Sequence, residues 1–582
     1  MKKTFRMLTT FCLLSGGIAL QANAQGSLDQ IRFELDSNQT ATYQEVMDFY
    51  ETLDEQFDEC SLFTYGMTDF GEPLRLLVLS KDRMFTPAEA KAAGKLVLLI
   101  NNGIHPGEPE GIDASMMLAR DLLRNNALPE NVVIAVIPVY NVGGMHRRGR
   151  SRANQNGPDA YGFRGNARNL DLNRDFIKGD SRNSRAFQEI FNTWDPDVFM
   201  DTHTSNGADY QYVMTLIDTQ RDKLHPELRE MASWMTDSLY SRMEGSQFPM
   251  IPYVSFRGRT PESGIVSFLE GPRYSTGYAA LHHTIGYMPE THMLKSYAQR
   301  VHSTYALLKH YVELSDLEST RLLAARKAAK LAASQQKSFA LNWTLDTTHF
   351  EEVDFLGFES GTKVSEVSGQ DRLFYDRSKP FKRTIRYYNQ YKPDVTVDAP
   401  LAYVIPQAWH DVVELLHLNG AQTVRLERDS LMELEMYYIE EYQTGRTAYE
   451  GHYMHSGVKV RTESQLIQLY AGDYIAYVNQ AANRYLVEVL EPQAPDSFFN
   501  WNFFDSVLSR KEYFSAYVFE DEAAEMLRNN ESLREAFEKA KQADEALSKS
   551  GQAQLTWIHA NSDYAEKTHM RYPIGRLIKH GE

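Results

Sequence analysis

Residues 96–108 read LVLLINNGIHPGE, an uninterrupted apolar run followed by a turn that carries His105 and Glu108. A short, continuous apolar run is typical of a strand that is buried on both faces of an α/β sheet. In such sheets, reacting groups gather beyond the carboxyl ends of the strands. The stretch therefore predicts an imidazole and a carboxylate that emerge together at the end of a central strand.

The segments around this stretch alternate between strand-like and helix-like patterns. Residues 74–79 and 131–140 are further apolar runs, and residues 111–125 carry apolar side chains at helical spacing. A helix-like segment at 184–194 then leads into the strand-like residues 197–200. This alternation predicts an α/β fold with a mixed, largely parallel central sheet and helices on both faces.

The chain of 582 residues is too long for a single hydrophobic core. We predict a signal peptide at 1–24, an α/β domain at 25–316 and a helical linker at 317–336, which is rich in Ala, Lys and Arg. Residues 337–582 are predicted to form one or more C-terminal accessory domains. Their aromatic-rich, strand-like sequence favours a β-rich or α+β structure.

The first residues have the pattern of a secretory signal peptide. Lys2, Lys3 and Arg6 precede the apolar residues 11–20, and the small residues of Ala22-Asn23-Ala24 form a cleavage site. We therefore predict an exported protein, periplasmic or secreted. A membrane anchor is disfavoured, because the apolar part is shorter than the roughly 20 residues that span a bilayer.

The formal net charge of the chain is −17. Such an acidic balance argues against nucleic acid as a partner, because nucleic-acid binding needs basic side chains to contact phosphates. No basic amphipathic stretch supports stable membrane insertion or binding. For the C-terminal part, contact with glycans or a cell surface stays open.

A third metal-capable side chain, His203, follows the strand-like residues 197–200. Three such donors at one end of a sheet match a catalytic zinc site, which often takes two His and one carboxylate and leaves a fourth position for water. We therefore predict one Zn²⁺ ion, held by His105, Glu108 and His203. Asp171, in the loop that returns to the site, is predicted to accept the other ring N–H of a ligand His.

Several short motifs occur in this chain in the order that they have in one enzyme family. They are His105-x-x-Glu108, Asp171-x-Asn173-Arg174, His203 and Glu290. Over residues 40–315 the chain thereby resembles the zinc metallocarboxypeptidases of the carboxypeptidase A and B family. A single His-x-x-Glu string would occur by chance, whereas the ordered set is specific.

The resemblance implies a role for each further matched residue. Glu290 would be the general base that takes a proton from zinc-bound water and passes it to the leaving amine. Asn173 and Arg174 would bind the free C-terminal carboxylate of the substrate, an anion that a guanidinium can bind bidentately. The implied partner is a peptide with a free C-terminus.

The resemblance also implies an arginine that stabilises the oxyanion and a tyrosine that closes over the substrate. Arg152 and Arg147 are our candidates for the first role, among six arginines of one glycine-rich loop. Tyr274 and Tyr278 are the candidates for the second. Within residues 264–287, the sequence does not identify the residue that sets the preferred C-terminal side chain, so this preference is left open.

Together these observations predict an exported zinc metallocarboxypeptidase that hydrolyses the last amide bond of peptides. One alternative is a related zinc amidohydrolase that acts on cell-wall peptides or acylated amino acids. Another is an inactive relative that binds peptides or surfaces. The inactive relative is disfavoured, because the metal donors, Glu290 and the Asn173-Arg174 pair all occur together.

Overall fold

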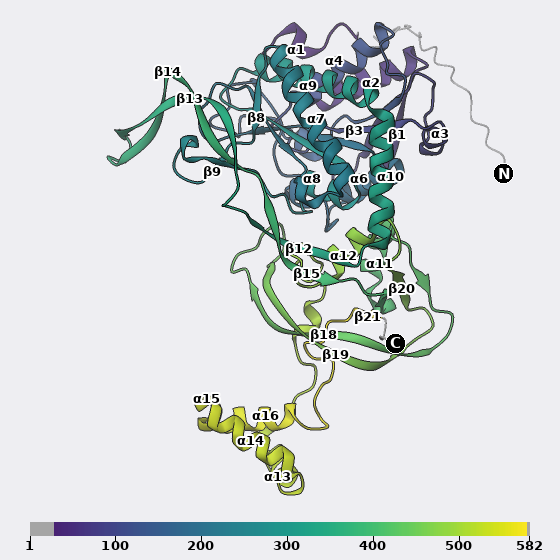
Figure 1. Cartoon of the computed structure of the whole chain (residues 1–582), viewed down its shortest axis with the longest axis vertical. Helices are drawn as coiled ribbons and strands as arrows, with labels where there is room; N and C mark the ends of the chain where they lie inside the picture. The colour runs from purple at the N-terminus through teal and green to yellow at the C-terminus, as the bar shows by residue number, and fades with distance from the viewer. Residues whose placement is uncertain (1–27, 579–582) are drawn as a thin grey trace, which may run out of the picture.

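Residues 28–578 are described by a computed structural model of the chain (Figure 1). The predicted signal peptide, residues 1–24, lies outside the described residues, so export stays a prediction. Among residues 28–578, no helix combines the length and the apolarity that a membrane crossing needs.

The first domain is built, within the described residues, on a nine-stranded sheet with the order β1-β2-β4-β3-β5-β11-β7-β8, in which β6 also pairs with β11. The strands are β1 Cys60–Met67, β2 Pro73–Leu79, β3 Leu96–Asn101, β4 Val132–Ile137, β5 Val198–Asp201, β6 His203–Ser205, β7 Met214–Asp218, β8 Met250–Pro252 and β11 Ile285–His292. β3 runs parallel to β4 and β5, and β5 runs parallel to β11. β2 and β7 are antiparallel to their inner neighbours. The sheet is therefore mixed with a parallel centre, which confirms the predicted fold class.

Alternate residues of β3 belong to two hydrophobic clusters, one on each face of the sheet. Leu98 and Ile100 belong to the cluster that includes side chains of α2, α4, α7, α9 and α10, whereas Val97 and Leu99 belong to the one that includes side chains of α6 and α8. The helices of this part are α1 Arg32–Leu35, α2 Tyr43–Gln56, α3 Pro87–Ala92, α4 Glu110–Arg124, α5 Val142–His146, α6 Arg182–Trp194, α7 Pro226–Gly245, α8 Ser275–Leu281, α9 Tyr297–Leu317 and α10 Ser319–Gln335. Burial on both faces is why the strand is apolar throughout.

The C-terminal half is rich in strands, as predicted. Its strands are β12 Ser338–Leu345, β13 Glu351–Val364, β14 Asp371–Tyr388, β15 Tyr391–Asp398, β16 Ala402–Ile405, β17 Val424–Arg425, β18 Ser430–Thr444, β19 His455–Leu469, β20 Tyr474–Tyr477 and β21 Gly575–Leu577. The long β13–β14 hairpin reaches back to the first domain, where β14 pairs with β10 Ile265–Val266, which pairs with β9 Ser255–Phe256 (Figure 1). α11 His410–Leu418 and α12 Asn483–Leu490 pack beside these strands.

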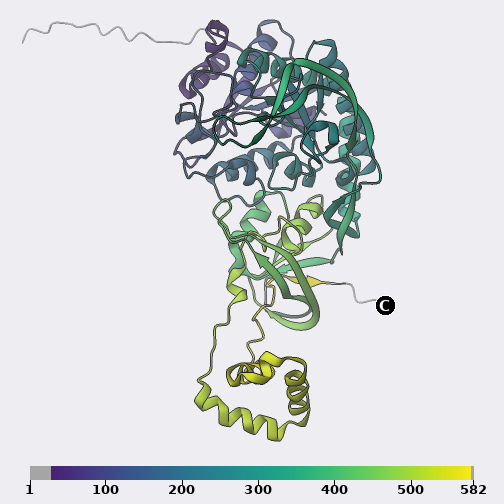
Figure 2. The ribbon, with the colours of Figure 1, turned by 90° about the vertical axis from the view of Figure 1, so that its left-hand side faces the viewer.

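A separate group of helices lies at the far end of the molecule from the first domain (Figure 2). It consists of α13 Ala516–Asn529, α14 Glu531–Ala543, α15 Glu545–Lys549 and α16 Gly551–Ala560. Their apolar side chains form a cluster of their own around Phe519 and Phe537. Two segments without helix or strand, one before α13 and one after α16, join this helical module to the rest.

The first domain and the C-terminal half share one hydrophobic cluster. Ile177 and Leu281 of the first domain belong to the same cluster as Leu415 and Phe498 of the C-terminal half. Arg273 donates a hydrogen bond to a carboxylate oxygen of the C-terminal half across the same boundary, at 2.8 Å. The two parts therefore pack against each other through a shared apolar cluster.

Candidate active site

The sheet brings the predicted metal ligands to one edge because their strands are neighbours. β3 ends just before the turn that carries His105 and Glu108, and β5 ends just before His203. His203 on β6 lies opposite Glu290 on β11 in the parallel register of the two strands. Gly103 starts the turn with a φ of +66°, a conformation that a residue with a Cβ rarely adopts.

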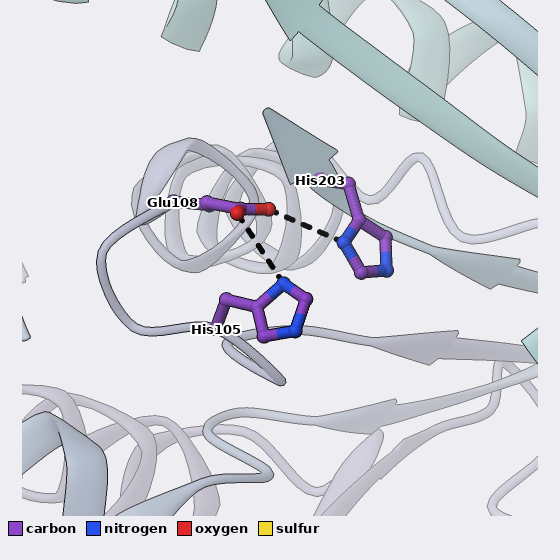
Figure 3. A group of neighbouring side chains, drawn as sticks. All are labelled: His105, Glu108 and His203. Atoms are coloured by element: carbon purple, nitrogen blue, oxygen red, sulfur yellow. Dashed lines mark hydrogen bonds and ion pairs between the residues drawn. The ribbon is translucent and has the colours of Figure 1, made fainter. Parts of the chain in front are cut away.

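His105, Glu108 and His203 form a cluster whose ligand atoms all lie within 4.8 Å of one another. The Glu108 carboxylate lies between the two imidazoles (Figure 3), with its oxygens 3.3 Å from His105 Nδ1 and 3.2 Å from His203 Nδ1. All three side chains are buried. His105 Nδ1 forms no hydrogen bond to any described residue. Two imidazole nitrogens and a carboxylate, aimed at one point, are the donor set that Zn²⁺ prefers.

Each histidine is held from behind by an aspartate. His105 Nε2 donates to Asp171 at 2.8 Å, and His203 Nε2 donates to Asp201 at 2.9 Å. These bonds select the tautomer that leaves each Nδ1 free to bind a metal. Asp171 stands where the sequence predicted it. Asp201 was not predicted, although its place two residues before His203, at the end of the same buried strand, would have revealed it.

The charges around the cluster are strongly coupled. Burial raises the pKa of the Glu108 carboxyl, but Arg152 and His105 outweigh burial and hold this pKa well below its usual range. Burial lowers the pKa of His203, whereas Asp201 and Glu108 raise it well above the usual value. The site is thus built for one positive charge at its centre, a charge that a cation can supply in place of a proton.

Glu290 lies beside the cluster in a different environment. No described residue donates a hydrogen bond to its Oε2, and this atom is buried. Burial raises the pKa of Glu290 to about 8, against an opposing effect of His203. A cation bound at the cluster would act in the same direction as His203, favouring the carboxylate.

A cavity of about 400 Å³ opens over these groups. Besides the metal-capable cluster and Glu290, the residues around it are Arg152, Arg164, Asn173, Arg174, Thr204, Ser205, Asn206, Ile217, Tyr253, Phe268, Glu270, Tyr274 and Met288. Positive side chains line it beside the carboxylates. The cavity can therefore hold an anionic group near the metal-capable cluster.

Asn173 and Arg174 lie on this cavity, in the short 3-10 turn Leu172–Arg174 that follows Asp171. The guanidinium of Arg174 lies over the ring of Tyr274, 4.5 Å from its centroid, so one of the two tyrosine candidates faces the cavity. Tyr278 does not. It is buried, and its hydroxyl donates to Asn419 of the C-terminal half at 2.5 Å.

The two arginine candidates for the oxyanion role differ in their positions relative to the cavity. Arg152 lines the cavity with Nη1 3.0 Å from Glu108 Oε1. Arg147 lies outside the cavity lining, and its guanidinium donates to the carbonyl of Ala167. Arg164, which the sequence did not single out, contacts both Glu108 at 3.5 Å and Asp171 at 2.8 Å.

Known proteins that are similar to this chain are carboxypeptidases. The model of the zinc carboxypeptidase family, Peptidase_M14, matches residues 46–321. Carboxypeptidase 2 of Trichophyton tonsurans is 23% identical over 481 residues, covering 75% of this chain and 80% of the relative. Carboxypeptidase 2 of Trichophyton rubrum is 22% identical over 445 residues, covering 70% of this chain and 74% of the relative.

Two solved structures that match part of this chain are also named as carboxypeptidases. Carboxypeptidase A from Helicoverpa armigera has 14% sequence identity and a TM-score of 0.37, covering 52% of this chain and 80% of that chain. A metallo-carboxypeptidase from Burkholderia cenocepacia has 15% identity and a TM-score of 0.35, covering 48% of this chain and 70% of that chain.

Proposed function

We propose that this chain, which belongs to the zinc carboxypeptidase family through residues 46–321, removes single residues from the C-terminus of peptides. Membership of the family makes it a peptide hydrolase. The observation that carries the finer proposal is one cavity that holds the metal-capable cluster, Glu290 and the Asn173-Arg174 turn. This combination suits hydrolysis of an amide next to a free carboxylate.

His105, Glu108 and His203 would hold one zinc ion. Bound there, the ion would lower the pKa of a water molecule to about 7 and polarise the scissile carbonyl. The protein's own contribution is to orient the two imidazoles through Asp171 and Asp201. The buried site also limits competing water.

Glu290 is the proposed general base. Its carboxylate would take the proton of the attacking water and return it to the nitrogen of the departing residue, so that no net proton is consumed. Burial and the free Oε2 support this role, because an atom without a partner is available to the reacting water.

Arg174 and Asn173 would bind the substrate's terminal carboxylate, with the Arg174 guanidinium steadied by the Tyr274 ring. Arg152 is the proposed donor to the oxyanion, since it lies on the cavity and Arg147 does not. The pattern of residues 1–24 supports export to the periplasm or the medium.

A digestion of a mixed peptide pool tests the proposal. The mature chain is loaded with Zn²⁺, and released amino acids are followed by mass spectrometry, with and without a chelator. We expect release of C-terminal residues that the chelator abolishes. An enzyme that releases no residue, or that ignores the chelator, would refute a zinc carboxypeptidase activity.

A second comparison separates the exopeptidase from a general amidohydrolase. Peptides with a free C-terminus should be cleaved at least 10-fold faster than their C-terminal amides, because the amide loses charge-assisted bonds to Arg174. Arg174→Ala should remove this preference, and Arg147→Ala is the matched control that should keep it. Equal rates on both substrates in the wild type would favour the amidohydrolase alternative.

A further inference from the structure

The tip of the β18–β19 hairpin lies against the loop that carries Asp171. The connection between these strands, residues 445–454, folds back on itself and ends in a two-residue turn, Glu450-Gly451. Tyr449 and His452 flank the turn and exchange backbone hydrogen bonds of 2.7 and 3.0 Å. Gly451 is 4.0 Å from the Leu170 side chain, measured from an ideal Cβ position. A part of the C-terminal half therefore reaches the edge of the proposed active site.

The backbone of this turn is unusual for a glutamate. Glu450 has a φ of +49° and Gly451 a φ of +84°. Positive φ at both central residues defines a type I′ turn, in which Asn, Asp or Gly normally takes the first position. A longer side chain is disfavoured there, so a glutamate at such a place calls for a reason in its contacts.

The contact is a hydrogen bond across the domain boundary. Glu450 Oε2 accepts the backbone N–H of Asp171 at 2.7 Å. Asp171 in turn joins several parts of the site: its carboxylate binds His105 at 2.8 Å and Arg164 at 2.9 Å. Its carbonyl accepts the N–H of Arg174 at 3.0 Å. The position of the Asp171 backbone therefore affects both a metal donor and the carboxylate-binding turn.

Other contacts hold the turn in place without Glu450. His452 Nε2 donates to Asp180 at 2.7 Å. The Tyr449 ring stacks on Trp501, with the centroids 6.1 Å apart, and Arg273 lies over both rings at 5.7 and 5.0 Å. Loss of the Glu450 side chain would thus leave the hairpin docked and remove only its bond to Asp171.

We propose that Glu450 is a positioning residue of the active site, supplied by the C-terminal half of the chain. Its carboxylate fixes the backbone of Asp171, and through it the ring of His105 and the turn of Arg174. The inference deepens the proposed function and rests on it. It assigns to the C-terminal half a part in zinc retention and in substrate binding.

Two substitutions separate this role from a purely structural one. Glu450→Asn suits the turn better than Glu but is one methylene shorter, so it loses the bond to Asp171. Glu450→Gln keeps an oxygen acceptor at the same reach. Thermal unfolding of each variant is measured beside two readouts: KM and kcat for a peptide with a free C-terminus, and the rate of Zn²⁺ release to a chromogenic chelator.

For Glu450→Asn we expect an unfolding midpoint equal to or above that of the wild type. KM should rise about 10-fold and Zn²⁺ release should be about 10-fold faster, the low end of the effect of removing an outer partner of a metal ligand. The change in kcat should be smaller than the change in KM. Glu450→Gln should match the wild type in its unfolding midpoint, its kinetic constants and its rate of Zn²⁺ release.

Glu414→Ala is the matched control. Glu414 also lies in the C-terminal half and faces an arginine of the first domain, Arg185, at 3.8 Å, but it does not contact Asp171. It should change neither readout. An Asn variant with wild-type KM and Zn²⁺ release would overturn the proposal, as would a Gln variant as impaired as the Asn variant. A wild type that cleaves no peptide would refute the proposed function, while the release rates would still decide the role of Glu450.

Discussion

Two carboxylates of the same cavity, Glu108 and Glu290, have opposite electrostatic surroundings. Glu108 faces Arg152 and two imidazoles, and its pKa lies well below the usual range. Burial dominates at Glu290 and raises its pKa to about 8. Carboxylates whose environments differ in this way commonly divide the work between charge binding and proton transfer. The first suits a metal ligand and the second a proton carrier.

Replacement of Glu290 by Gln tests this division. The variant keeps the shape of the cavity but cannot accept a proton, so kcat should fall by about 10² to 10⁴-fold. The zinc content of the purified protein, measured by atomic emission, should equal that of the wild type. A variant that lost its zinc would identify Glu290 as a ligand, and a variant with nearly full kcat would exclude it as the base.

Glu270 makes stability depend on pH. It is buried, one of its oxygens accepts the N–H of Thr276 at 3.1 Å, and burial raises its pKa to about 7. The unfolded carboxyl loses its proton near pH 4 and the folded one near pH 7, so this group destabilises the fold progressively between these values. The loss amounts to about 3 kcal/mol and is complete above pH 7.

Glu270→Gln should therefore become more stable relative to the wild type as the pH rises. Urea unfolding at pH 5 and pH 8 measures the change, and we expect the advantage of the variant to grow by about 2 kcal/mol between them. Glu189→Gln, on the exposed side of α6, should show no such growth. A constant difference at both pH values would contradict the raised pKa of Glu270.

At the scale of elements, the composition of α10 does not reveal how the helix is packed and which of its side chains are buried. The composition of residues 317–336, rich in Ala, Lys and Arg, predicts a helical linker, yet α10 packs against α7 and buries Arg326. The Arg326 guanidinium binds Asp195 and Asp197 next to β5, with the second pair at 3.2 Å. The helix is thus joined to the end of the central sheet by ion pairs around a buried arginine.

Arg326→Met should destabilise the protein by about 3 to 5 kcal/mol, because it leaves the buried carboxylate of Asp197 without its arginine partner. Lys327→Met, at the next and exposed position of the same helix, is the control and should stay within about 0.5 kcal/mol of the wild type. Urea unfolding at pH 7 compares the two. Equal midpoints would show that α10 contributes no more than a linker.

Local sequence patterns predict some parts of the candidate site, whereas other parts depend on contacts that only the fold brings together. The grouping of His105 and Glu108 at the sheet edge could be predicted, because an apolar strand, read locally, places the residues that follow it there. Tyr274 and Tyr278 could not be separated, because they lie one helical turn apart at the start of α8. Only the fold shows that the second points away, toward Asn419 of the other half. Glu450 was out of reach for the same reason, since its contact spans 279 residues.

At the scale of the whole molecule, the helical module is the part that is most loosely joined. Its apolar cluster is separate from the others, and a cavity of about 770 Å³ lies between it and the β18–β19 strands. Segments without helix or strand at both of its ends are preferred sites of proteolysis. The module should therefore be removable without damage to the active site.

Limited proteolysis tests this expectation. Trypsin at low ratio should cut first in residues 509–515 or 561–569, and mass spectrometry of the fragments identifies the sites. After cleavage, kcat/KM should stay within about 2-fold of the intact protein, because none of the residues that line the active-site cavity belongs to the helical module. Early cleavage inside the first domain, or loss of activity with the first cut, would contradict a loosely joined module.

The hydrophobic cluster shared by the two halves also sets when activity can arise during synthesis. Ile177 and Leu281 belong to the same cluster as side chains that lie as far along the chain as Phe504 and Tyr572. A ribosome makes the first domain long before those residues exist, so nascent or truncated chains expose this apolar surface and stay unfinished. A chain organised in this way is therefore expected to complete its active site late, once residues as far along as Tyr572 have been made.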